Sequence, residues 1–184
     1  MNHTNYKGKI LVANLSIYGD PFFSKTVILL IEDEEGFVTG VVLNEPAQAK
    51  MGELIEKSYS LRETTVYLGG PVSEEEMYFL HSKKDFGGIA VTSKLFLSSD
   101  IDSALIDFTH TDSIDGNVRF FMGYCGWTKE QLEDEVKKGY WLIIDTFDEN
   151  ILQKTPSELW KELIISFNNM YSIWANAPID PSMN

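Results

Sequence analysis

The single cysteine of the chain, Cys125, is the first residue whose setting could support chemistry. A nucleophile at a tight strand-to-helix turn needs glycine two residues before and two residues after it, because side chains do not fit there. Gly123 meets this condition and Trp127 does not. The run CGW also lacks the second cysteine of the cysteine-protease signature, and no distant histidine with an orienting partner is evident. We therefore expect Cys125 to be a small, buried residue at a turn and not a nucleophile.

Three further side chains could supply general acid–base catalysis, namely His81, Glu135 and Asp20. A hydrolase or isomerase could use the histidine with one of the carboxylates, provided that both groups come within about 3 Å of the reacting atom or its bridging water. His81, however, is expected at the C-terminal end of a helix, where the helix dipole alone would favour a histidine. Asp20 precedes Pro21 in the run YGDPFF, which indicates a turn. Catalysis by these residues is therefore the alternative hypothesis.

Two glycine-containing turns could instead bind a ligand through their backbone. The run GGPV permits positive φ and a close backbone approach at its two glycines. The run GYCGWT presents free N–H groups at a helix start, where an anionic group could bind. The structural alternative is that both runs only shape a turn and cap a helix. The ligand-binding candidates are Asn44 of the run LNEP, Gly69, Gly70, Pro71, Gly126, Trp127 and Gln131.

The sequence predicts no metal site and no cofactor. Three scattered histidines and one cysteine supply no close pair of zinc ligands. The run TDSIDGN beside His110 is rich in Asp, but it lacks the full ligand ladder and the closing glutamate of a calcium loop. The run GGPV lacks the length, the lysine and the hydroxyl residue of a phosphate-binding loop.

The charge of the chain argues against nucleic acid as a direct partner. With 28 acidic and 15 basic residues the formal net charge is −13, so the average surface field repels phosphate groups. The basic residues are scattered singly or in pairs and form no stripe that would offset this field. The partner is therefore expected to be an unidentified small molecule or protein, and the oligomeric state is left open.

The N-terminal sequence and the hydropathy indicate a cytoplasmic protein that does not associate with a membrane. The start MNHTNYKGK lacks the basic region and following apolar region of a secretory signal. The longest aliphatic run, residues 27–31, is far shorter than the roughly 20 residues needed to cross a bilayer. The length of 184 residues favours one domain over residues 1–184, with a core at about 8–174 and a frayed tail at 175–184.

Hydrophobic patterning predicts about seven strands with helices between them. β-branched and apolar runs indicate strands within residues 9–15, 26–44, 65–70, 88–98, 117–125 and 140–147. Capping signals indicate helices at 72–81, 127–139 and 155–174, and further helices are expected at 51–57 and 98–108. Since no strand–helix–strand alternation is sustained, the pattern favours an α+β fold.

Two of these helices are predicted from explicit start signals. In residues 72–81, Ser73 is expected to cap the helix while Glu76 reaches back to it. In residues 127–139, Thr128 and Gln131 have the same spacing, and Gly139 is expected to end the helix. If such local signals decide the backbone, both segments are helical.

Several motifs occur in an order that resembles one known family. They are GKILVAN, DPFFSKTVILLIE, GVVLNEP, VYLGGPVSEEEMYFLH and RFFMGYCGWTKEQLEDEVKKGYW, followed by a final LW, and they extend from about Gly8 to about Trp160. This series resembles the YqgE/AlgH family of bacteria, also described as the uncharacterised protein family UPF0301. The chain departs from the family pattern at Asn14 and Leu15, where a proline is usual, and at Cys125, where alanine is common.

The resemblance implies a compact α+β domain with a largely antiparallel, barrel-like sheet and helices packed outside it. In such a sheet the end loops could bring Asp20, Asn44, His81 and Trp127 into one cleft. Some family members carry a transcriptional-regulator label. With no recognisable helix-turn-helix and an acidic charge, direct DNA binding is the least favoured function for this chain. The leading hypothesis is a non-enzymatic binding or regulatory protein with a cleft between the GGPV and GYCGW turns.

Overall fold

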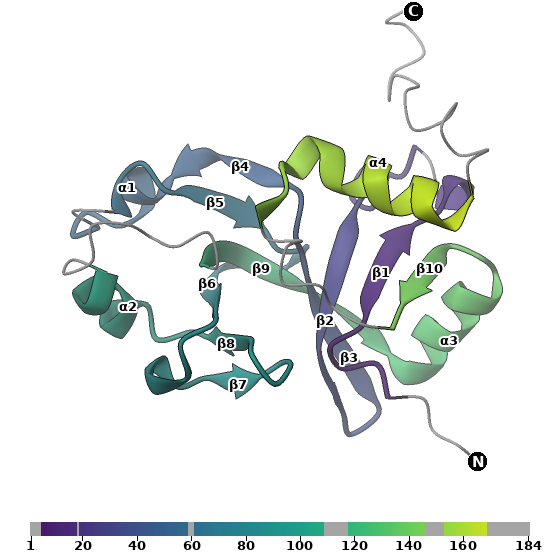
Figure 1. The fold of residues 1–184 in the computed structure, drawn as a ribbon, viewed down its shortest axis with the longest axis horizontal. Coiled ribbons are helices and arrows are strands. Elements are labelled where there is room, and N and C mark those ends of the chain that lie inside the picture. The colour runs from purple at the N-terminus through teal and green to yellow at the C-terminus, as the bar shows by residue number, and fades with distance from the viewer. Residues whose placement is uncertain (1–4, 18, 59–60, 109–117, 146–152, 169–184) are drawn as a thin grey trace, which may run out of the picture.

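The computed structural model describes residues 5–17, 19–58, 61–108, 118–145 and 153–168 (Figure 1). The strands are β1 (Ile10–Ala13), β2 (Val27–Glu34), β3 (Phe37–Val42), β4 (Pro46–Lys50), β5 (Thr65–Leu68), β6 (Val72–His81), β7 (Ile89–Ala90), β8 (Phe96–Ser98), β9 (Arg119–Thr128) and β10 (Trp141–Ile144). The α-helices are α1 (Met51–Leu54), α2 (Ile101–Phe108), α3 (Lys129–Lys137) and α4 (Pro156–Phe167). Short 3-10 helices follow β1 at Leu15–Ile17 and β6 at Lys84–Phe86.

The strands form one largely antiparallel sheet that does not close on itself. Its order is β10-β1-β2-β3-β9-β6-β8-β7, and β5 and β4 branch from β9. Each pair of neighbouring strands is antiparallel except β5 with β9. The predicted α+β class and largely antiparallel sheet are confirmed. Within the described ranges the sheet has ten strands where about seven were predicted.

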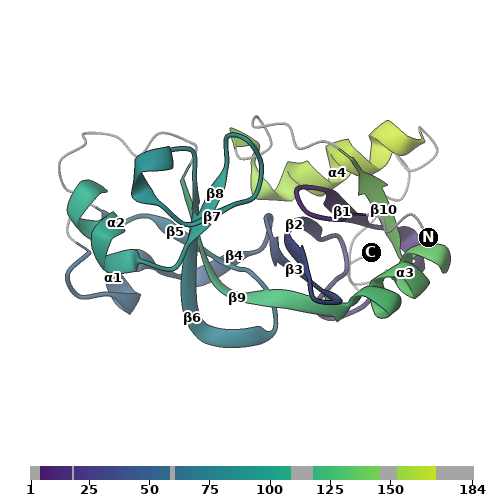
Figure 2. The same ribbon diagram turned by 90° about the horizontal axis from the view of Figure 1, so that it is seen from below.

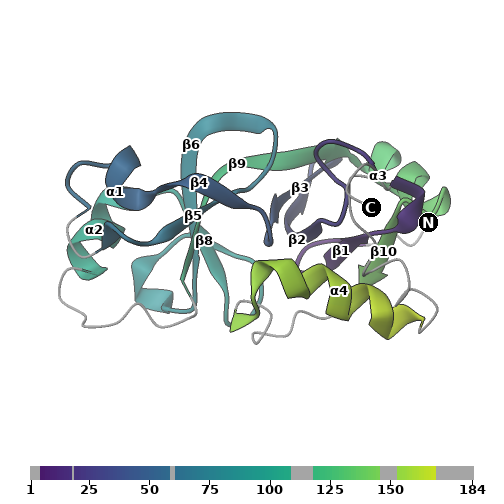
Figure 3. The ribbon, with the colours of Figure 1, turned by 90° about the horizontal axis from the view of Figure 1, so that it is seen from above.

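Strand β9 joins the two halves of this sheet. Residues 120–122 lie between β5 and β6, whereas residues 125–128 pair with β3. Figure 2 shows β9 crossing from the half with β5 and β6 to the start of α3. Figure 3 shows α4 over the half with β1 and β10, while α1 and α2 lie at the opposite end. The predicted turn at GYCGW is therefore wrong, because the run lies within the strand that connects both halves and Cys125 pairs with Gly40 of β3.

The buried apolar side chains form two hydrophobic clusters, and the larger one includes residues from both halves of the sheet, among them Leu80 and Leu97. The larger cluster contains all five residues from Val27 to Ile31, together with Trp127 and Trp160. The smaller cluster contains Phe79 and Phe120. An uninterrupted buried run such as 27–31 requires a strand that is covered on both faces, as its continuous apolar sequence predicted.

The predicted helix at residues 72–81 is wrong, because this segment is strand β6. Ser73 has φ +48° and caps no helix. Residues 77–80 pair with β9 on one side, and residues 79–81 pair with β8 on the other. The local capping signal contributes about 1 kcal/mol. Ladders on both sides and the burial of Phe79 and Leu80 outweigh it, because one fully buried side chain alone contributes about 1.5–3 kcal/mol.

The other predicted helices are confirmed. Helix α3 begins where Thr128 Oγ1 accepts a 3.1 Å hydrogen bond from the N–H of Gln131. It ends before Gly139, which has φ +74°. Helix α4 begins with Pro156 at its first position, as expected from a residue without a backbone N–H. The predicted continuation of this helix through residues 169–174, and the predicted tail at 175–184, lie outside the described residues.

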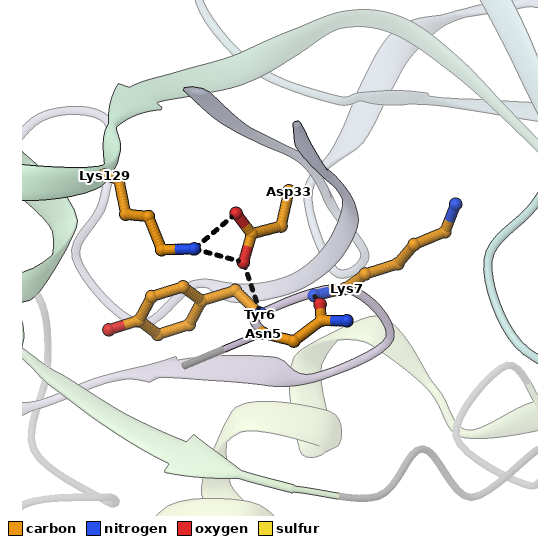
Figure 4. Close-up of polar contacts among 5 residues, drawn as sticks. All are labelled: Asn5, Tyr6, Lys7, Asp33 and Lys129. Carbon is orange, nitrogen blue, oxygen red and sulfur yellow. Dashed lines mark hydrogen bonds and ion pairs between the residues drawn. The ribbon is translucent and has the colours of Figure 1, made fainter. Parts of the chain in front are cut away.

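A buried ion pair fastens the N-terminal segment and α3 to β2 (Figure 4). Lys129 Nζ lies 2.8 and 3.0 Å from the two carboxylate oxygens of Asp33. The same carboxylate accepts a 2.8 Å hydrogen bond from the N–H of Tyr6, and the Lys129 ammonium lies 5.9 Å from the centre of the Tyr6 ring. Since the Asp33 side chain is only 4% exposed, this carboxylate depends on these donors for its solvation.

Candidate functional site

The GGPV turn lies directly against the backbone of β9. Gly69 N–H donates to the carbonyl of Met122 at 2.7 Å, and the Gly69 carbonyl accepts from Val42 N–H at 2.8 Å. A Cβ on Gly69 would lie 2.2 Å from the carbonyl oxygen of Gly123. Gly70 has φ +156°, and a Cβ there would lie 2.2 Å from the carbonyl carbon of Tyr124. The close backbone approach predicted for the two glycines is thus real, and it serves the contact between two chain segments.

Two adjoining cavities lie beside this contact. The first, which we call the aromatic cavity, has a volume of about 360 Å³ and is lined by residues that include Asp20, Phe23, Pro71, Trp127, Glu135 and Trp141. The second, the apolar cavity, has a volume of about 670 Å³ and is lined by residues that include Phe22, Val42, Leu68, Glu74 and Met122. Asp20, Phe23 and Pro71 line both. We call the two cavities together the cleft.

Glu135 organises the aromatic cavity. Its Oε2 accepts hydrogen bonds from the indole nitrogens of Trp127 at 3.0 Å and Trp141 at 2.7 Å. Its Oε1 accepts a 2.9 Å hydrogen bond from Gln131 Nε2, one helical turn earlier in α3. Because the two indoles come from β9 and β10, one carboxylate on the helix between them fixes both rings.

Three aromatic rings pack against one another in this cavity. The ring centres of Phe23 and Trp141 are 5.6 Å apart and those of Trp127 and Trp141 are 6.2 Å apart, both edge to face. Phe23 and Trp127 are 6.4 Å apart at an angle of 37°. Edge-to-face contacts of this kind are favourable because the positive ring edge meets the negative ring face. The three rings therefore pack together as one wall of the cavity.

Asp20 shapes the loop that lines both cavities. Its Oδ1 accepts hydrogen bonds from the N–H groups of Phe22 and Phe23, both at 2.8 Å. This arrangement is the turn that the run YGDPFF predicted. It also places Phe22, which is 62% exposed, beside the apolar cavity.

Cys125 is buried and 1% exposed, although it is among the residues that line the aromatic cavity. Its thiol donates a 3.4 Å hydrogen bond to the Gly69 carbonyl. Burial raises the pKa of the Cys125 thiol to about 12, so the thiol stays protonated and is a poor nucleophile at neutral pH.

The expected convergence of four residues is met only in part. Asp20 and Trp127 line the same cavity, and so do the candidates Pro71, Gly126 and Gln131. Gly70 lines the apolar cavity. Asn44, Gly69 and His81 are not among the described residues that line the cleft. Asn44 instead joins two loops, since its Oδ1 accepts from Val27 N–H at 2.7 Å and its Nδ2 donates to the Lys25 carbonyl at 2.9 Å.

His81 lies in an aromatic environment and not at the end of a helix. It is the last residue of β6 and has 0% exposure. Its ring centre is 5.0 Å from that of Phe79, 5.6 Å from Phe86 and 5.7 Å from Phe96. Burial lowers the pKa of His81, which keeps the ring neutral. His81 therefore lines neither of the two cavities that Asp20 and Glu135 line, and the pairing required for acid–base catalysis is not supported.

The sequence did not indicate the bonds between Glu135 and the two tryptophans. The available signal was the position of Trp127 and Trp141 just outside the two ends of α3, but whether two such indoles meet one carboxylate depends on strand pairing. A third cavity of about 470 Å³, lined by residues that include Glu32, Tyr78, Asp100 and Tyr124, was also missed.

The described part of the chain offers neither a cluster of metal ligands nor a membrane-spanning helix. No group of three or more His, Cys, Asp or Glu side chains in these ranges could hold a metal ion. Among the helices of the same ranges, none has the length and apolarity required to span a bilayer. The run TDSIDGN and His110 lie outside the described residues, as does His3.

Comparisons with known proteins agree on the fold. A family model described as AlgH-like matches residues 10–172. A UPF0301 protein of Parabacteroides distasonis is 32% identical over 181 residues, which cover 97% of this chain and 91% of the relative. A UPF0301 protein of Cytophaga hutchinsonii is 32% identical over 185 residues, which cover 97% and 98%.

Two solved structures have the same architecture. The AlgH protein from Pseudomonas aeruginosa matches with a TM-score of 0.73 at 25% identity over 97% of both chains. Protein DIP2367 from Corynebacterium diphtheriae matches with a TM-score of 0.76 at 18% identity over 96% of this chain and 95% of its own. The names of these proteins specify no ligand and no reaction.

Proposed function

We propose that this chain, which belongs to the AlgH-like family, is a non-enzymatic binding protein that takes a small ligand or a segment of a partner protein into the cleft. One observation carries the proposal, namely that two cavities of about 360 and 670 Å³ adjoin at Asp20, Phe23 and Pro71. Each volume falls within the range of roughly 300–1,000 Å³ that is typical of ligand sites.

The chemical character of the cleft supports binding. Its aromatic cavity is walled by three mutually packed rings, and its apolar cavity is flanked by Phe22 and Leu68, which are 62% and 47% exposed. Large apolar side chains that gather beside a hollow are favourable to cover, because burial removes their surface from water. Polar groups at fixed positions, such as the Glu135 carboxylate, would orient the ligand.

The geometry gives less support to the other two hypotheses. Acid–base catalysis with His81 would need a carboxylate within reach, and the ring of His81 is surrounded by Phe79, Phe86 and Phe96. Phosphate binding would need basic side chains, and the described residues lining the cleft include several carboxylates but no Lys or Arg. Binding in the cleft is thus the function that the site favours.

A fragment screen by NMR tests the proposal. The indole N–H resonances of Trp127 and Trp141 report directly on the aromatic cavity, and the screen should contain cationic, neutral and anionic compounds in equal numbers. We expect at least one class to shift these resonances in a saturable way. The same compounds at 100-fold over their dissociation constant should stabilise the fold by about 2.7 kcal/mol in a thermal-shift assay.

A matched pair of variants separates the cleft from the rest of the surface. Val72→Trp places a large side chain beside the aromatic cavity, whereas Ile106→Trp places the same side chain on α2, outside the cleft. Binding of fragments, or capture of a partner protein from lysate, should be lost in Val72→Trp and kept in Ile106→Trp. If no compound of any charge binds and no captured protein distinguishes the two variants, the proposal is wrong.

A further inference from the structure

The Glu135 carboxylate is held in place by neutral donors, and the nearby Lys138 ammonium, which acts on it electrostatically, is itself paired with Asp134 at 2.6 Å. The three hydrogen-bond donors to Glu135 are Trp127, Trp141 and Gln131, which are all neutral. Within residues 5–17, 19–58, 61–108, 118–145 and 153–168, no Lys, Arg or His forms an ion pair with it. Neutral donors hold the carboxylate in place and leave its charge available to a bound group.

A second carboxylate lines the same cavity in the same condition. Asp20 is held by the N–H groups of Phe22 and Phe23, and it too has no ion-pair partner among the described residues. The adjoining apolar cavity adds Glu45 and Glu74 to its lining. Like charges around one hollow repel each other, and a bound cation would relieve that repulsion.

The walls of the aromatic cavity are suited to an organic cation. The faces of tryptophan and phenylalanine rings attract ammonium and guanidinium groups through the ring quadrupole, by about 0.5–2 kcal/mol per contact. Phe23, Trp127 and Trp141 all line this cavity. A bare metal ion fits less well, because no cluster of three ligating side chains is present in the described part of the chain.

We propose that the aromatic cavity binds a primary ammonium or guanidinium group carried on an apolar body, with the carboxylates of Asp20 and Glu135 facing the charge and the apolar cavity receiving the body. This inference rests on the proposed function and names its ligand class. It also gives the net charge of −13 a role, since a negative protein attracts a cationic ligand over a distance.

Four small probes of similar length test the ligand class on the full chain. They are n-butylguanidinium, n-butylammonium, neutral n-butylurea and anionic butyrate. n-Butylurea has nearly the shape of n-butylguanidinium without its charge. We expect the two cations to shift the indole resonances of Trp127 and Trp141 in a saturable and salt-sensitive manner, and n-butylurea and butyrate to bind at least tenfold more weakly.

Asp20→Asn is the most informative variant, because both backbone hydrogen bonds to Asp20 end on Oδ1 and an amide oxygen can accept both. The loop should therefore keep its shape while one charge is removed. We expect affinity for n-butylguanidinium to fall about tenfold and affinity for n-butylurea to stay unchanged. The exposed Glu56→Gln, which lies outside the cleft, makes the same change in net charge and should leave both affinities unchanged.

Each other outcome has a defined meaning. If n-butylurea binds as tightly as n-butylguanidinium, or if Asp20→Asn and Glu56→Gln have equal effects, the inference of a cationic ligand is wrong while a binding cleft can still stand. If none of the four probes binds but the fragment screen finds neutral or anionic ligands in the cleft, the inference is likewise wrong. If neither experiment finds a ligand or a partner, both proposals fail.

Discussion

Replacement of Glu135 by alanine should destabilise the fold more than its half-buried position suggests. The change removes the acceptor of the indole N–H groups of Trp127 and Trp141. Both tryptophans are buried, with an exposed fraction of 4% each. A buried donor without an acceptor costs about 1–3 kcal/mol. Because water can reach the two indole donors from the cavity, we take the lower part of this range, about 1–2 kcal/mol for each donor. The two donors together predict a loss of about 2–4 kcal/mol in the free energy of unfolding.

Glu135→Gln separates the hydrogen bonds from the charge. A glutamine oxygen can accept both indole bonds, and the Gln131 amide can turn so that its oxygen meets the new amide nitrogen. We therefore expect this variant to lose about 1 kcal/mol or less. Glu130→Ala, on an exposed position of the same helix, should also cost less than about 1 kcal/mol.

Urea unfolding followed by far-UV circular dichroism measures these differences without dependence on tryptophan emission. A double-mutant cycle with Trp141→Phe, which removes one of the two indole donors, should show a coupling of about 1–2 kcal/mol with Glu135→Ala. Equal losses for Glu135→Ala and Glu135→Gln, together with no coupling to Trp141→Phe, would refute the reasoning.

Three further changes have defined outcomes. Burial lowers the pKa of His81, so as the pH falls below the ordinary value of 6.5 the unfolded chain binds a proton at this residue before the folded chain does. The free energy of unfolding should therefore decrease below pH 6.5, by at most about 1.4 kcal/mol per pH unit. Urea titrations should find that His81→Phe lacks this decrease. Asp33→Asn should cost about 3 kcal/mol because it leaves the Lys129 ammonium, whose side chain is only 17% exposed, without its anion. The exposed Asp134→Asn should show no measurable change in the same urea assay. Gly70→Ala should cost at least about 2 kcal/mol in thermal unfolding, since its Cβ would meet the β9 backbone. Gly126→Ala should be neutral or stabilising, because its Cβ would lie 3.7 Å from the Tyr124 ring, an ordinary van der Waals contact.

The start and the end of α3 were predicted correctly because both signals lie close to the helix in the chain. Thr128 caps α3 through a bond to a residue three positions later, and Gly139 ends it by adopting positive φ. Both depend on neighbours within one turn, so a short stretch of sequence contains the whole interaction. The close approach of the GGPV turn was predictable for a related reason, because only glycine lacks the Cβ that such an approach excludes.

The error at β6 shows where local signals fail. Ser73 and Glu76 have the spacing of a capping box, yet residues 77–80 bond to β9, more than 35 positions later. A cap contributes about 1 kcal/mol, while a two-sided ladder with a buried Phe79 contributes several times more. The consequence for function is direct, because the same error placed His81 at a helix end and made it available as an acid or base.

The amino-acid sequence by itself determined the α+β class, the caps of α3 and the need for glycine in the GGPV turn, since each follows from composition, from neighbours close in the chain or from the lack of a Cβ. Only the tertiary structure decided that β9 links two half-sheets, that Glu135 receives the indoles of both Trp127 and Trp141, and that Asp20 shares their cavity while Asn44 and His81 do not. These features depend on which distant strands pair and in which register. A shift of one residue in a strand would turn each of its side chains to the opposite face of the sheet, so the cleft exists only once that register is set.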